Sequence, residues 1–171
     1  MAVQSGAKSH PFSNPTALLS DCHRRIEMFL GSLQRVGEFV DQPLSKDARS
    51  ALQSALRYFR EAAPKHTADE EQSLFPRLRQ AHLPIAENAI LALEALECEH
   101  QQANNLHAEV NSLGIQCLEY GPLSLAGASR FQHAISELAK IHKEHIRVED
   151  EVVFPAADQI LSGGEKAASR P

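Results

Sequence analysis

The sequence predicts an all-α fold, an up-down-up-down four-helix bundle with a short C-terminal helical extension. Apolar residues recur at alternating steps of three and four along four segments, the pattern of helices that bury one stripe in a bundle. Short turns with Pro and Gly separate these segments, and no stretch alternates apolar and polar residues as a strand does. A chain of 171 residues, 43% of them hydrophobic, is long enough to bury one such core.

Start and stop signals divide the chain into its helices. Asn14 is the expected N-cap of the first helix, with Pro15 at the first helical position, and Ser45 opens the second helix. Pro64 falls inside the second helix and predicts a kink rather than a break, because the apolar stripe keeps its register across it. Pro76 is expected to end that helix. The four expected helices span about residues 14–40, 45–75, 84–118 and 124–155.

The chain is expected to form one domain with two tails, and its charge and hydropathy argue against two kinds of partner. Residues 1–13 and 162–171 are expected to be flexible tails around one domain at 14–161. Seventeen basic and 22 acidic residues give a net charge of −5 without a Lys/Arg block, so no nucleic-acid partner is expected. No run of 18 apolar residues exists, so no membrane partner is expected either.

The N-terminus and the cysteines predict a cytoplasmic location. The first residues lack the apolar stretch of a secretory signal. Three cysteines form an odd set without CxxC spacing, which argues against a disulfide scaffold and against a thiolate zinc site. A reducing compartment fits this cysteine usage.

Ionisable residues stand at core positions of all four expected helices, which is unusual for a bundle. The first helix carries His23 and the third carries His100, each among leucines. In the second and fourth helices a histidine is followed four residues later by a glutamate, which places both on one helix face. The stripe of the fourth helix runs Phe131, Ile135, Leu138, His142, His145, Glu149, Val152.

The two halves of the chain resemble each other around these residues. HTADEEQSLFP begins at His66 and HIRVEDEVVFP begins at His145, so both have His, a Glu four later, a second acid, and then Phe-Pro. His23 precedes His66 by 43 residues, and His100 precedes His145 by 45. Such a repeat predicts two helical hairpins related by a pseudo-twofold axis.

The spacing also predicts that these side chains meet. At about 1.5 Å per residue, the lone histidine of each hairpin and its partner lie at one height in the bundle. Four imidazoles and two carboxylates in a core need a common partner, because an unpaired buried carboxylate is costly. A metal satisfies the whole set, and nitrogen and oxygen ligands without thiolate favour iron or manganese over structural zinc. Two glutamates from opposite helices suit bridging between two ions.

Several polar residues near this set have open interpretations. His142 is either an additional ligand or a donor behind the ligands, and Glu27, on the flank of the first stripe, is an alternative ligand. His107 is expected to be a hydrogen-bonded core residue. Glu71 and Asp150 either orient the ligand imidazoles or are exposed flank residues.

Other residues are expected to have no part in the site. Cys22 and Cys98 lie next to His23 and His100 in sequence, and we expect buried packing residues there rather than accessible redox-sensing thiols. Exposed positions are expected for His10, His82, His133 and Glu137.

These motifs resemble the HHE cation-binding domain of hemerythrin-like proteins, over about residues 15–160. That family's pattern is a lone His, a His-x-x-x-Glu, a second lone His and a second His-x-x-x-Glu, commonly followed by Phe-Pro. The resemblance implies a hemerythrin-like bundle with a non-haem di-iron centre, two iron ions that manganese or zinc could replace, and Glu70 and Glu149 as bridging carboxylates. The implied metal ligands are His23, His66, Glu70, His100, His145 and Glu149.

The sequence departs from oxygen-carrying hemerythrins at one ligand. Those proteins have a second histidine four residues after the third-helix ligand, where this chain has Asn104, and a wider His-to-Asp spacing where this chain has His145 and Glu149. The resemblance is therefore closer to HHE members linked to nitric oxide and peroxide handling, iron-centre repair or iron sensing. The expected partner is a small diatomic ligand or peroxide, which the protein binds or senses. The alternatives are an enzyme that reduces peroxide or nitric oxide, and an iron donor or reservoir.

Overall fold

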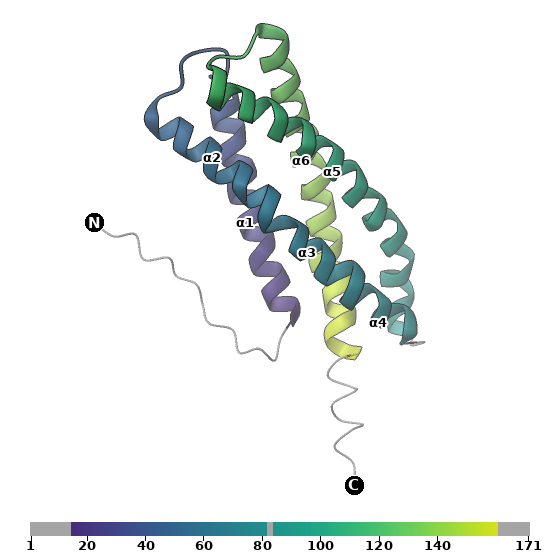
Figure 1. Ribbon diagram of the computed structural model, residues 1–171. Helices are drawn as coiled ribbons and strands as arrows, with labels where there is room; N and C mark the ends of the chain where they lie inside the picture. Colours follow the sequence, from purple (N-terminus) through teal and green to yellow (C-terminus); the bar gives the residue numbers. More distant parts are fainter. Residues whose placement is uncertain (1–14, 82–83, 161–171) are drawn as a thin grey trace, which may run out of the picture.

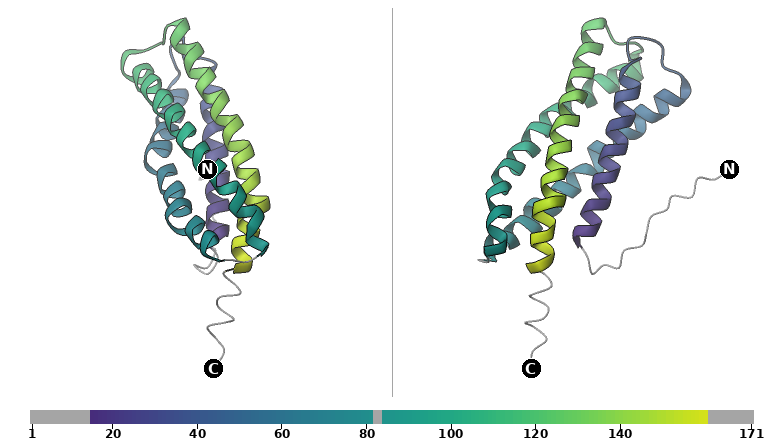
Figure 2. Two further views of the ribbon diagram at one scale, coloured as in Figure 1. Left: turned by 90° about the vertical axis from the view of Figure 1, so that its right-hand side faces the viewer. Right: turned by 180° about the vertical axis from the view of Figure 1, so that it is seen from behind.

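Long helices that pack side by side make up the described chain, and the predicted all-α bundle is confirmed (Figures 1 and 2). The computed structural model describes residues 15–81 and 84–160. Expectations for the two tails, for Asn14 and for His82 therefore lie outside the described residues. The α-helices are α1 (Pro15–Gly37), α2 (Lys46–Glu61), α3 (Ala63–Asp69), α4 (Phe75–Gln80), α5 (Glu87–Tyr120) and α6 (Leu125–Val148).

Capping residues fix the ends of these helices near the predicted positions. The Ser45 hydroxyl accepts a hydrogen bond from the backbone N–H of Ala48 at the start of α2, and Ser124 does the same for Gly127 at the start of α6. α1 ends at Gly37, a few residues before the predicted end. Gly121 follows α5 with a φ of 95°, a conformation that L side chains rarely adopt, and turns the chain toward α6.

The second helical rod is longer and less regular than predicted. The helix is interrupted at Ala62, although the Ala62 N–H still donates to the Tyr58 carbonyl four residues earlier. It resumes in α3 with Pro64 in its first turn. It continues through a π-helical segment, η1 (Glu70–Leu74), into α4, so the expected end at Phe75 is wrong. The fourth rod likewise continues beyond α6 through η3 (Glu149–Val153) to residues 154–160. A 3-10 turn, η2 (Pro84–Ala86), precedes α5.

Two apolar clusters fill the bundle, and the ionisable core residues lie between them. The larger cluster joins α1, α2, α5 and α6 toward the connecting turns and includes Leu33, Leu52, Phe131 and Leu138, all fully buried. The smaller cluster, near the other end, includes Phe75, Leu93 and Val153. No helix in the described part of the chain is long and apolar enough to cross a membrane.

Candidate metal centre

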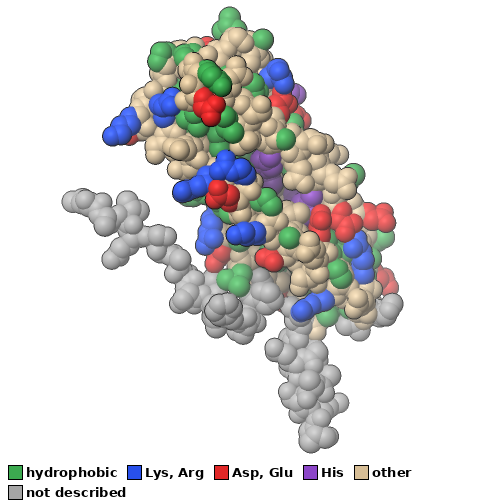
Figure 3. All heavy atoms as spheres, in the orientation of Figure 1, with side chains coloured by type: hydrophobic (Ala, Val, Ile, Leu, Met, Phe, Trp, Pro, Cys, Tyr) green, Lys and Arg blue, Asp and Glu red, His purple; other side chains and the backbone are tan. Residues whose placement is uncertain are grey.

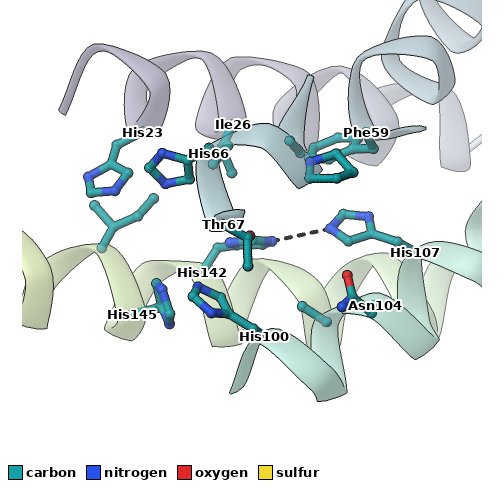
Figure 4. Close-up of a pocket in the computed structure, with 14 residues that line it drawn as sticks. His23, Ile26, Phe59, His66, Thr67, His100, Asn104, His107, His142 and His145 are labelled. Carbon is teal, nitrogen blue, oxygen red and sulfur yellow. Dashed lines mark hydrogen bonds between the residues drawn. The ribbon is translucent and has the colours of Figure 1, made fainter. Parts of the chain in front are cut away.

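The six residues singled out in the sequence meet inside the bundle. All six are buried, and Glu70 and Glu149 have no exposed surface. Figure 4 shows the imidazoles of His23 and His66 facing those of His100 and His145 across the interior. Two groups of potential ligand atoms result, each with its members within 4.8 Å of one another: His23, His66, Glu70, Glu149 and Glu70, His100, His145, Glu149.

Glu70 connects the two hairpins because its oxygens point to different helices. Oε1 lies 3.0 Å from Nε2 of His66, one turn earlier in the same rod. Oε2 lies 3.4 Å from Nε2 of His100 on α5, and Oε1 is also 3.9 Å from Nε2 of His23 on α1. The carboxylate is therefore placed between the two groups.

Glu149 repeats this arrangement from the opposite side. Its Oε1 lies 3.2 Å from Nε2 of His145 in its own rod, and its Oε2 lies 3.0 Å from Nε2 of His23 on α1. Both glutamates thus divide their oxygens between the histidine of their own rod and the lone histidine of the other hairpin. This is the pseudo-twofold relation that the sequence repeat predicts.

A π-helical segment begins at each glutamate, a feature that the sequence analysis missed. The N–H of Phe75 donates to the Glu70 carbonyl, and the N–H of Phe154 donates to the Glu149 carbonyl, five residues back in each case. Proline follows each phenylalanine and would clash with the carbonyl four residues earlier in a regular α-helix, so a wider turn accommodates it. The repeated Phe-Pro dipeptide was the available signal.

The same phenylalanines cover the ligand imidazoles. Phe154 stacks on His23 with ring centroids 5.3 Å apart, and Phe75 is parallel to His100 at 6.4 Å. Each ring therefore comes from one hairpin and covers a histidine of the other. The widened turns aim the glutamates inward and hold this apolar cover directly behind the imidazoles.

Carboxylates outside the six fix the orientation of three imidazoles. Glu71 Oε1 lies 2.8 Å from His100 Nδ1, and Asp150 Oδ1 lies 3.2 Å from His23 Nδ1. Of the two interpretations for these acids, the structure supports the orienting one. An Nδ1–H that donates outward leaves Nε2 with a lone pair facing the interior, as a metal ligand requires.

Glu99 orients His145 in the same way, and the sequence analysis did not identify it. Its Oε2 lies 2.9 Å from Nδ1 of His145, across the interface between α5 and α6. Glu99 is the residue before His100 and lies outside the repeated motif. Its position relative to the lone histidine was the only signal.

The charges in this core need a positive partner. Within the described residues, both oxygens of each glutamate and Nε2 of His23 are buried without a hydrogen-bond partner. Burial opposes the ionisation of Glu70, but the adjacent imidazoles of His100, His23 and His66 outweigh it and hold its pKa well below the usual value. A cation between these oxygens would supply the same compensation, which is how the residues present fit a metal.

The pKa values of the ligand histidines shift in the opposite direction, upward, when no metal is bound. Burial alone would lower the pKa of His23, but the nearby carboxylates of Glu149 and Glu70 raise it to about 9. Burial likewise opposes the charge on His66, whose interactions with Cys22 and Glu70 raise its pKa to about 10. Protons and metal ions therefore compete for the same imidazole nitrogens.

Comparison with known proteins agrees with this geometry. The model of the hemerythrin HHE cation binding domain matches residues 14–157. The chain belongs to this family. A protein of Haemophilus influenzae (strain ATCC 51907 / DSM 11121 / KW20 / Rd), described as uncharacterized, is 26% identical over 152 residues, covering 88% of this chain and 83% of its own length. With the family and the two buried His/Glu groups, the HHE domain is a metal-binding protein.

The alternative ligands of this HHE domain lie apart from the two groups. Glu27 is exposed. His142 faces His107, with the two Nε2 atoms 3.3 Å apart (Figure 4). Burial lowers the pKa of His107 to about 4 and that of His142 to about 3, so both are neutral at pH 7. The expectation of a hydrogen-bonded His107 agrees with this contact.

The His107–His142 pair and the four ligand imidazoles border one small cavity of about 50 Å³. Ile26, Phe59 and Ile146 contribute apolar walls. Leu30 is buried in the larger apolar cluster and Leu96 in the smaller one, and neither lines this cavity.

The cysteines of the HHE domain differ from the expectation. Cys98 is exposed, so the prediction of a buried packing residue is wrong there, because its helix position faces away from the bundle. Cys22 is half-buried beside His66. His133 is exposed as expected, and Glu137 forms an ion pair with Lys140 at 2.6 Å.

Proposed function

We propose that this HHE domain holds two non-haem iron ions and uses them to bind or sense oxygen, nitric oxide or peroxide. The observation that carries the proposal is that two buried groups of two histidines and two glutamates share both glutamates. Carboxylates shared in this way suit bridging between neighbouring cations. A set of imidazole nitrogens and carboxylate oxygens suits iron, with manganese or zinc as possible substitutes. The proposed ligands are His23, His66, Glu70, His100, His145 and Glu149.

The protein groups around the ions would perform two tasks. Glu71, Glu99 and Asp150 hold three ligand imidazoles in one orientation. Phe75 and Phe154 exclude water from the side opposite the cavity. Iron, when bound, supplies coordination positions for a small ligand and the capacity to change oxidation state.

The cavity beside the four imidazoles supports a small ligand rather than an organic substrate. Its volume of about 50 Å³ suits a few atoms, since one water needs roughly 10–15 Å³ on this measure. A second cavity of about 240 Å³ adjoins it and shares Phe59, Pro64, Asn104 and His107 with it. Figure 3 shows histidine side chains in a hollow on the face formed by α2, α3 and α5, which gives a ligand a way in.

Metal analysis with an optical spectrum tests the proposal. We expect about two iron ions per chain, one for each ligand group, and an absorption spectrum that changes when peroxide or nitric oxide is added. The control is His133→Ala, which removes an exposed histidine of α6 and should leave metal content unchanged. A chain purified from iron-supplemented cells that holds no transition metal would contradict the proposal.

The same samples separate binding from its alternatives. Spectral changes without steady-state consumption of peroxide or nitric oxide support binding or sensing. Sustained turnover would instead support a di-iron reductase. Transfer of iron to an apo-protein acceptor would support an iron donor.

A further inference from the structure

The groups behind the four ligand imidazoles follow the pseudo-twofold symmetry, with one exception. The acid after each glutamate contacts the lone histidine of the other hairpin, as Glu71 does at His100 and Asp150 does at His23. The residue before each lone histidine occupies a second set of equivalent positions. One of these is Glu99, a carboxylate, and the other is Cys22, a thiol.

Cys22 occupies the position that this symmetry places behind His66. Glu99 contacts His145 at 2.9 Å, so the residue equivalent to Glu99 should contact His66. The Cys22 thiol interacts with the His66 ring, and it is half-buried beside it. In the part of the chain that the structure describes, Nδ1 of His66 is buried without a hydrogen-bond partner, so no carboxylate there takes this place.

The two groups of potential ligands therefore differ in the charge behind them. Glu71 and Glu99 both stand behind the group that contains His100 and His145. Among the described residues, Asp150 is the single carboxylate behind the group that contains His23 and His66. A carboxylate behind an imidazole fixes its orientation and makes it a better ligand, and a neutral thiol does so less well.

We propose that Cys22 is the positioning residue for His66, and that its thiol makes the His23/His66 position the weaker of the two cation sites. The proposal rests on the proposed function only in requiring that both groups bind cations. It predicts two cation sites of unequal affinity in a ligand set that is otherwise nearly symmetric. One ion would then be held firmly while the other exchanges more readily.

Chelator competition with Fe²⁺ or Co²⁺ on the metal-free protein measures both affinities. We expect two dissociation constants that differ by about tenfold or more, the usual effect of a group behind a metal-bound histidine. Cys22→Asp restores a carboxylate of similar size and should tighten the weaker site. Glu99→Cys makes the reciprocal exchange and should weaken the tighter site by about 10- to 100-fold.

Cys98→Ala is the matched control, since Cys98 is an exposed cysteine close to a ligand histidine and should change neither constant. Co²⁺ absorption bands report whether the ion at the altered position keeps its geometry, which general destabilisation of the fold would not change selectively. Equal affinities in the wild type, or Cys22→Asp and Glu99→Cys variants with unchanged constants, would overturn this inference alone. A chain that binds no cation would overturn the proposed function and this inference with it.

Discussion

Glu70 Oε2 lies 3.4 Å from His100 Nε2 on the opposite hairpin, so this carboxylate belongs to both ligand groups. We expect Glu70→Gln to lose most of both ions, because a neutral amide compensates neither cation. His66→Ala removes a ligand of one group only and should lose mainly one ion. Metal content after gel filtration measures the difference.

Stability should follow metal content in these variants, because cations that bind only the folded chain stabilise it. Thermal unfolding with and without a chelator checks this. Glu149→Ala should resemble Glu70→Gln, since Glu149 is shared in the same way. Full retention of iron in the two glutamate variants would contradict the ligand assignment.

Ala103→Leu should separate ligand binding from metal binding. Ala103 is buried and lines the cavity of about 50 Å³ without contributing a polar atom. A larger side chain there occupies the space for a ligand, at a packing cost of roughly 1–3 kcal/mol. We expect unchanged iron content and an affinity for nitric oxide or azide lower by about tenfold or more.

Ala108→Leu is the control for this variant, because Ala108 is exposed and lines the second cavity of about 240 Å³ but not the one beside the imidazoles. It should leave the equilibrium affinity close to that of the wild type. Loss of iron from Ala103→Leu, or an unchanged ligand affinity, would contradict a ligand position in the cavity of about 50 Å³.

The His107–His142 pair predicts a loss of stability in acid. Burial lowers their folded-state pKa values to about 4 and 3, against about 6.5 in an unfolded chain. Below pH 6.5 these two imidazoles become protonated in the unfolded state but stay neutral in the folded state. The free energy of unfolding therefore falls as the pH drops from about 6.5 toward 4. Between pH 7 and 5 the loss should be on the order of 1–2 kcal/mol per histidine.

Urea unfolding of the metal-free protein at pH 7 and pH 5 measures this dependence. The double variant His107→Leu/His142→Leu should lose less stability over this interval, although other groups still titrate. A loss equal to that of the wild type would contradict neutral burial of the pair.

Most of the fold and the six central residues could be predicted from the sequence, because both depend on periodic positions. The stripe places His145 and Glu149 inward, and the repeat places them against their counterparts, without knowledge of any loop. Pro76 was misinterpreted, because a proline ends a helix unless the preceding turn widens, and no local propensity distinguishes these outcomes.

The groups behind the ligands were less predictable because they depend on contacts between helices. Glu71 and Asp150 were candidates through the repeat, but Glu99 reaches across to another helix from a flank position. Cys98 shows the same difficulty, since one step around a helix separates a buried from an exposed position. Such rotations are decided by the packing of the bundle as a whole.

Gly114 on α5 packs directly against the side chain of Leu56 on α2. A Cβ at this position would lie 2.7 Å from Leu56 Cδ1 and 3.0 Å from its Cδ2, closer than carbon atoms pack. Alanine improves helix propensity by about 1 kcal/mol, but crowding a packed core costs roughly 1–3 kcal/mol. We therefore expect Gly114→Ala to destabilise the protein, as a lower denaturant midpoint at pH 7 would show.

Two further variants show whether the contact with Leu56 is the cause. Gly114→Ala/Leu56→Val removes the crowding atoms and should recover part of the stability relative to the sum of the single changes. Gly31→Ala in α1 is the matched control, because the nearest atom to its Cβ is the flexible end of Arg35 at 3.5 Å. This control should be stabilised by about 0.5–1 kcal/mol through helix propensity alone. If Gly114→Ala is stabilised to the same extent, Leu56 moves aside without cost and the close approach of the two helices does not constrain the sequence.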